Sequence, residues 1–177
     1  MLLQFSVKNF KSFKDEAVLS LEASADKDLP ENLTTISKTR CLNTVAVFGA
    51  NVAGKSNLFA ALASAILLIR RSNLRQVKEP LTEIVPFRFD SESVLQPTSF
   101  EFVSFAEEKK YVYGFSATQK EVQTLRFHSY RSNNKQFMLM KQRPVIVMIG
   151  ESINKNRTNT IDDRLVRFDW CSSCFQL

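Results

Sequence analysis

The sequence predicts an α/β fold with α+β character, in which one long helix accompanies largely antiparallel strands. A continuous run of apolar and β-branched residues at 44–48 is followed by apolar residues that recur at helical spacing over 56–69. Residues 98–106 and 109–118 instead alternate at a period of two, which is typical of strands with one buried face. A length of 177 residues and a hydrophobic content of 44% suit one ordinary domain, or one lobe of a larger assembly.

The N-terminal part predicts two paired strands. LLQFSVKNF, from Leu2, alternates apolar and polar residues, and EAVLSLEA, 16–23, alternates loosely after a polar interruption. Residues 24–43 contain Pro30 and many small polar side chains, which favours a long loop with a short turn of structure. TVAVF, 44–48, is bounded by a glycine and is expected to be a buried strand.

A helix is expected from Ser56 to about Ser72 or Asn73. Its apolar residues recur every three or four positions, and four alanines add helix propensity. The longest uncharged apolar run, LFAALASAILLI, has 12 residues, well below the roughly 20 that a membrane-spanning helix needs. The first twenty residues carry five charged side chains, so they contain no apolar signal-peptide segment. The expected location is therefore the cytoplasm.

After this helix the pattern turns antiparallel. FRF at 87–89, TSFEFVSFA at 98–106 and KKYVYGFSAT at 109–118 each alternate and are expected to be strands. AEEKK supplies a polar turn between the last two, which predicts a hairpin.

Charge is distributed unevenly along the chain. Residues 1–123 contain 15 basic and 14 acidic side chains, whereas residues 124–177 contain 9 basic and 4 acidic ones. A basic tail without helical or aromatic spacing is more often a solvated surface than a nucleic-acid patch. Cys171 and Cys174 form a C-x-x-C near the end of the sequence, and with Cys41 and His128 they could make at most one four-ligand zinc set from three scattered places. Reduced thiols are the simpler interpretation.

The motif that carries chemistry lies between the predicted strand and the predicted helix. Residues 49–56, GANVAGKS, match G-x-x-x-x-G-K-[ST] without a gap. Glycines let backbone N–H groups approach a phosphate closely, and the start of a helix adds unpaired N–H groups and a positive dipole end. Lys55 would reach the β- and γ-phosphates, and the Ser56 hydroxyl would bind Mg²⁺. The structural alternative is a glycine-bearing turn with a solvated lysine.

Two motifs together resemble a known family. MLLQFSVKNFKSFKDEAVLSL followed by FGANVAGKSNLFAAL is similar to the start of the predicted ATPases related to RecF, the SMC proteins and the OLD and abortive-infection ATPases. Their ATP-binding-cassette heads begin with a strand, an NF-x-SF turn, a second strand and a GAN-x-[SA]-GKSN loop. The resemblance extends through the hairpin region to about Gln123. It implies the N-terminal lobe of such a head, with antiparallel strands and without its remaining half.

The resemblance also implies a site for ATP and Mg²⁺. The turn after the first strand lies near the nucleotide in this family. The residues expected to bind the cofactor are therefore the loop residues Gly49, Ala50, Asn51, Val52, Ala53, Gly54, Lys55, Ser56 and Asn57, the turn residues Asn9, Phe10 and Lys11, and for the metal Ser56.

Three departures from the family pattern limit the expected activity. Val52 stands where the family tends to have Gly or Ala, and a β-branched residue at positive φ is strained. In PVIVMIGE, Gly150 replaces the Asp that orders Mg²⁺, although Glu151 follows. No Ser-Gly-Gly signature occurs in the sequence. We therefore expect ATP–Mg²⁺ binding without efficient hydrolysis.

The part of the chain after Leu125 loses the family pattern. It shows little periodicity apart from VIVMI, which could be a buried strand. The expected organisation is an ATP-binding lobe at 1–123 and a basic, atypical tail at 124–177. One hypothesis for this tail is truncation or a frame shift in a longer ATPase.

Several functions remain open. The resemblance implies an ATP-binding head for phage defence or DNA maintenance, with a possible homodimer through the head and a possible nuclease or DNA partner. The alternatives are a basic nucleic-acid-binding module and an ATPase fragment without function. A GTPase is disfavoured because INKNR, 153–157, lacks the Asp of a guanine-reading motif. A small-molecule kinase is disfavoured because its frame would be a parallel sheet.

Overall fold

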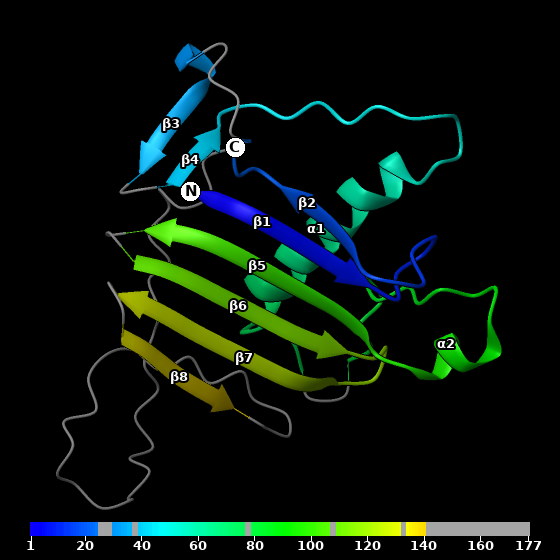
Figure 1. The fold of residues 1–177 in the computed structure, drawn as a ribbon. Coiled ribbons are helices and arrows are strands. Elements are labelled where there is room, and N and C mark those ends of the chain that lie inside the picture. Colours follow the sequence, from blue (N-terminus) through cyan, green and yellow to red (C-terminus); the bar gives the residue numbers. More distant parts are fainter. Residues whose placement is uncertain (25–29, 37–38, 77–78, 107–108, 132–133, 141–177) are drawn as a thin grey trace, which may run out of the picture.

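The fold is built on one six-stranded antiparallel sheet with a long helix against one face (Figure 1). The computed structural model describes residues 1–24, 30–36, 39–76, 79–106, 109–131 and 134–140. The sheet has the order β2-β1-β5-β6-β7-β8, with strands β1 (Leu2–Lys8), β2 (Ala17–Ser20), β5 (Thr98–Ala106), β6 (Lys109–Ala117), β7 (Val122–Arg131) and β8 (Asn134–Met140). The other elements are η1 (Pro30–Asn32), the hairpin β3 (Leu33–Ile36) and β4 (Thr39–Leu42), α1 (Lys55–Arg71) and α2 (Ser91–Leu95).

Helix α1 packs on the sheet through small and aliphatic residues. Ala61 and Ala65 are completely buried, and Leu68 is nearly so. Because alanine has a short side chain, the helix backbone can lie close to the rings of Phe5 and Phe100 that cover this sheet face. The Phe5 and Phe100 rings are themselves stacked, with centroids 6.4 Å apart. This apolar layer fixes where the first turn of α1 lies relative to the sheet.

A second, smaller apolar cluster lies at the end of the sheet that carries the β3–β4 hairpin (Figure 1). Cys41 of β4 is fully buried there against Leu3 and Val103. Burial raises the pKa of the Cys41 thiol, since the thiolate would lose hydration. The N-terminal ammonium of Met1 donates to the Phe105 carbonyl oxygen at 2.7 Å. The hairpin and the chain start are thus both fixed to the main sheet.

The expectation of a buried strand at 44–48 was wrong. The segment has no strand structure, and Phe48 is 89% exposed. Within the described part of the chain, no backbone group of residues 44–48 makes a hydrogen bond. The β-branched composition favours a strand only if neighbouring strands supply ladder partners, and the described residues supply none at this position.

The expectation of a strand at 87–89 was also wrong. These residues form no ladder, and Phe89 is 90% exposed. The Phe87 N–H donates instead to the side-chain oxygen of Asn9, at 3.0 Å. A side-chain acceptor has therefore taken a donor that a sheet would have used.

Two stretches that looked irregular contain strands. The expected loop at 24–43 includes the β3–β4 hairpin, in register from Leu33 opposite Leu42 to Ile36 opposite Thr39. The stretch after Leu125 shows little periodicity, yet it contains the end of β7, which pairs with β8 from Leu125 opposite Met140 to Arg131 opposite Asn134. Strand β7 also continues across the boundary placed after residue 123. The VIVMI run, Gly150 with Glu151, INKNR and the C-terminal cysteines lie outside the described residues.

Candidate functional site: a phosphate-binding loop

Helix α1 begins directly after a glycine whose backbone only glycine adopts easily. Gly54 is the N-cap of α1 and has φ 89° and ψ 3°, in the left-handed region. A Cβ atom at this position would lie 3.0 Å from Ser12 Oγ and 3.3 Å from Phe13 Cζ. The positive φ angle and the close approach of Ser12 and Phe13 therefore both require glycine at position 54.

The first turn of α1 presents unused donors. Asn57 and Leu58 N–H groups both donate to the Gly54 carbonyl oxygen, at 2.9 and 3.0 Å. The backbone N–H groups of Gly54, Lys55 and Ser56 make no hydrogen bond within the described part of the chain. They lie at the positive end of a 17-residue helix. Such a set of amides is suited to an anion.

Lys55 folds back over the loop that precedes it. Its Nζ donates to the Gly49 and Ala50 carbonyl oxygens, both at 2.7 Å. The ammonium group is thus held at the start of the loop, five and six residues back along the chain. A phosphate bound at the helix start would compete with these carbonyls for Nζ. The contact closes the loop and does not involve the amides of Gly54, Lys55 and Ser56.

Ser56 fits the role of a Mg²⁺ ligand. It is the second residue of α1, next to Lys55, and it is exposed. Mg²⁺ in nucleotide sites takes few protein ligands and completes its shell with phosphate oxygens and water. Among the described residues there is no cluster of three or more His, Cys, Asp or Glu side chains that would hold a metal alone. A metal here would therefore arrive with a phosphate ligand.

Val52 is strained as the sequence suggested. Its φ is 67°, and its side chain is fully exposed. A β-branched residue in this region costs of the order of 1–3 kcal/mol, and an exposed isopropyl group gains nothing from packing. The strain belongs to the loop that forms the candidate site.

We expect Val52→Gly to stabilise the protein by roughly 1 kcal/mol, because relief of the left-handed strain exceeds the extra chain entropy of glycine. The neighbouring Ala53→Gly is the matched control. Ala53 is not at positive φ, so it should lose about 0.5–1 kcal/mol through entropy alone. Urea denaturation measures both. Equal destabilisation by the two substitutions would show that Val52 carries no strain.

The three predicted turn residues have structural roles. Asn9 is buried and donates from Nδ2 to the Ser93 and Gln96 carbonyl oxygens, at 2.7 and 2.8 Å. Phe10 is completely buried, and its ring meets that of Phe100 edge-on at 5.8 Å. Lys11 has φ 47°, and its Nζ lies 5.6 Å from the centre of the Phe10 ring. Their contact with a nucleotide stays a prediction.

The turn residues that do touch the loop are Ser12 and Phe13. The Asn57 side chain donates from Nδ2 to Ser12 Oγ at 2.9 Å, and both turn residues face Gly54. They were part of the NF-x-SF motif but were absent from the predicted site. The NF-x-SF motif itself is the signal that could have included them, because it contains both residues.

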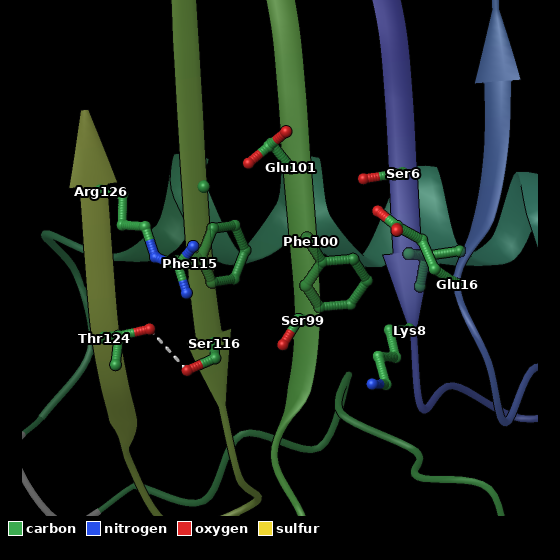
Figure 2. Close-up of a pocket in the computed structure, with 12 residues that line it drawn as sticks. Ser6, Lys8, Glu16, Ser99, Phe100, Glu101, Phe115, Ser116, Thr124 and Arg126 are labelled. Carbon is green, nitrogen blue, oxygen red and sulfur yellow. Dashed lines mark hydrogen bonds between the residues drawn. The ribbon is translucent and has the colours of Figure 1, made fainter. Parts of the chain in front are cut away.

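A separate hollow of about 170 Å³ lies in the main sheet. Figure 2 shows α1 behind the strands and the polar lining residues on the side turned away from it. The hollow lies beside Gly114, which has no side chain, between Glu101 of β5 and Arg126 of β7. Ser116 and Thr124 bond to each other there at 2.7 Å. None of the loop residues 49–57 lines this hollow.

Three features define a protein of the P-loop nucleoside-triphosphatase class: a loop that ends at a left-handed glycine, helix-start amides without a partner in the described ranges, and a lysine that reaches back over the loop. The family model described as "AAA domain, putative AbiEii toxin, Type IV TA system" matches residues 45–165, and the chain belongs to this family. Neither the curated proteins nor the solved structures contain a significant match to this sequence. None of the helices in the described ranges is long and apolar enough to cross a membrane.

Proposed function

We propose that the chain binds ATP together with Mg²⁺ at the loop 49–57. The observation that carries this proposal is the set of amides at Gly54, Lys55 and Ser56, which stand at the start of α1 and have no hydrogen-bond partner among the described residues. The first N–H groups of a helix have no intrahelical partner, and adjacent donors of this kind beside a glycine-containing loop and a lysine favour an anionic ligand. Membership of the AAA-domain family supports a nucleotide as that anion.

In this proposal each group of the loop has a defined role. The amides of Gly54 to Ser56 donate to phosphate oxygens. The Lys55 ammonium leaves one or both of the carbonyl oxygens that it now contacts and binds the β- and γ-phosphates. The Ser56 hydroxyl would hold Mg²⁺, which neutralises charge on the phosphate oxygens when it is bound.

We further propose that binding occurs without appreciable turnover. Hydrolysis by such ATPases uses an Asp for Mg²⁺ and a Glu for the attacking water, and Gly150 stands in the Asp position of the candidate motif. The resemblance to RecF, SMC and OLD heads supports a role in phage defence or DNA maintenance, as a dimer or with a nuclease or DNA partner. The family description, a putative toxin of a type IV toxin–antitoxin system, is compatible with a defence role.

Equilibrium binding and phosphate release test this function separately. We expect ATP to bind in the presence of Mg²⁺, with at least tenfold weaker binding when EDTA removes the metal. Phosphate release should remain at the level of a Lys55→Ala control. Phosphate release well above this control would contradict the proposal of binding without turnover. Equal ATP affinity of the wild type and Lys55→Ala would contradict the assignment of the site to the loop.

A further inference from the structure

The β1–β2 turn, residues 9–14, is the contact between the phosphate-binding loop and the sheet. Ser12 Oγ accepts a hydrogen bond from Asn57 in the first turn of α1, at 2.9 Å. Gly54 approaches the same oxygen so closely that a Cβ atom would lie 3.0 Å from it. Ser12 therefore lies against Gly54, the last residue before α1, and bonds to Asn57 in the helical turn that would receive the phosphates.

The other side of this turn is bonded to a second segment, residues 85–97. The Lys11 N–H donates to the Val85 carbonyl oxygen at 2.8 Å. Asn9 bonds to this segment in both directions, through Nδ2 to the Ser93 carbonyl and through Oδ1 to the Phe87 N–H. These are buried or half-buried bonds. The turn and the segment therefore have to move together or lose several hydrogen bonds.

An ion pair adds a further link at the surface. Lys14 Nζ lies 3.0 Å from Asp90 Oδ2. The Ser93 hydroxyl also donates to Asp90, at 2.7 Å, and this bond with the Lys14 contact lowers the pKa of the Asp90 carboxyl below its usual value. Asp90 is therefore the charged partner of Lys14 at neutral pH, and the pair is a weak additional contact between the segment and the turn.

The segment 85–97 carries three exposed apolar side chains, Phe89, Val94 and Leu95. Their side chains are 90%, 46% and 81% exposed. In Figure 1 this part of the chain, which includes α2, projects beyond the end of the sheet. Because hydrogen bonds join this segment to the β1–β2 turn, a change in the position of the turn would change how these apolar side chains are presented to a partner.

We infer that Ser12 is a positioning residue that couples phosphate binding at residues 54–57 to the order of the segment 85–97. This inference rests on the proposed function, because it needs an anion at the helix start. Phosphate oxygens that bind the amides of Gly54 to Ser56 hold the first helical turn in one position. Asn57 belongs to that turn, and its bond to Ser12 passes the restraint to the β1–β2 turn and on to residues 85–97.

Hydrogen exchange of the segment 85–97, measured with and without Mg–ATP on the full chain, tests the coupling. In the wild type we expect exchange in this segment to slow by roughly 2- to 10-fold, the ratio that one hydrogen bond can transmit. Ser12→Ala should abolish this slowing while it weakens ATP binding by no more than about 10-fold. Ser20→Ala removes a hydroxyl from an exposed residue of β2, where it accepts a local bond from the Glu22 N–H at 3.3 Å, and it should behave as the wild type.

Asn57→Ala removes the same hydrogen bond from the other partner and serves if Ser12→Ala does not fold. Both variants together should lose no more coupling than either alone, because one bond is removed in each case. ATP binding with unchanged slowing in Ser12→Ala and Asn57→Ala would overturn the coupling alone. Absence of ATP binding by the wild type would overturn the coupling and the proposed function together.

Discussion

Saturating Mg–ATP is expected to raise the melting temperature of the wild-type chain, and Lys55→Ala is expected to abolish the rise. A ligand at about 100 times its Kd stabilises the native state by about 2.7 kcal/mol. For a chain of this length that corresponds to roughly 5–10 °C. Lys55 is decisive because its ammonium is the cationic side chain that already lies on the loop, at 2.7 Å from two of its carbonyl oxygens.

Lys120→Ala is the matched control for this experiment. Lys120 is an exposed lysine in the turn between β6 and β7. Its substitution removes the same charge at a position far along the chain from the loop. It should keep the full ATP-dependent rise. A loss of the rise in both variants would show that net charge, rather than the loop, governs the effect. A rise that survives in Lys55→Ala would place the nucleotide elsewhere.

Phe10→Ala is expected to destabilise the protein by about 3–5 kcal/mol, the usual cost of removing a buried phenyl ring. Its ring is completely buried and meets Phe100 edge-on. Phe10 also lies in the turn that bonds to the segment 85–97. The cavity would therefore form beside Phe100 of β5, in the turn that joins the sheet to this segment. Urea denaturation gives the loss in the free energy of unfolding.

Phe89→Ala is the control for Phe10→Ala, because it deletes the same ring from a side chain that is 90% exposed. It should change the free energy of unfolding by no more than about 0.5 kcal/mol. Similar losses for the two variants would contradict the assignment of Phe10 to the core. Phe10→Leu should recover more than half of the loss, since it fills most of the space.

The parts of the fold that the sequence predicts well have their partners close along the chain. The helix over 55–71 follows from its apolar period, and the β5–β6 hairpin follows from two alternating runs around a polar turn. Strands β1 and β2 pair as expected. In each case local periodicity already determines which face is buried.

The wrong expectations concern segments whose structure depends on distant partners. Composition favoured a strand at 44–48, but a ladder needs neighbours, and within the described ranges this segment has none. At 87–89 the alternation was real, yet the distant Asn9 side chain binds the Phe87 N–H. In the expected loop, the threonines of LTTI and TRCL were among the polar residues that favoured irregular structure. In the folded chain they are strand residues, each opposite a residue of the other strand of the β3–β4 hairpin.

The candidate site divides in the same way. The glycine and lysine positions of the loop follow from the motif alone, and so does the strain at Val52. The structural roles of Asn9 and Phe10 did not follow, because they depend on contacts with residues about 80 to 90 positions away. The motif contained Ser12, but only the folded geometry shows that it bonds to Asn57.

Amide resonances of the loop give the most direct test of the central claim, that backbone N–H groups at the start of α1 hold a triphosphate. In ¹⁵N-labelled protein titrated with Mg–ATP, the Gly54, Lys55 and Ser56 amide protons should shift downfield together, with one dissociation constant, as they become donors to phosphate. The resonances of Gly114 and its neighbours in the sheet hollow should stay in place. A titration in which the loop amides remain unmoved, or in which only the sheet resonances respond, would contradict the account.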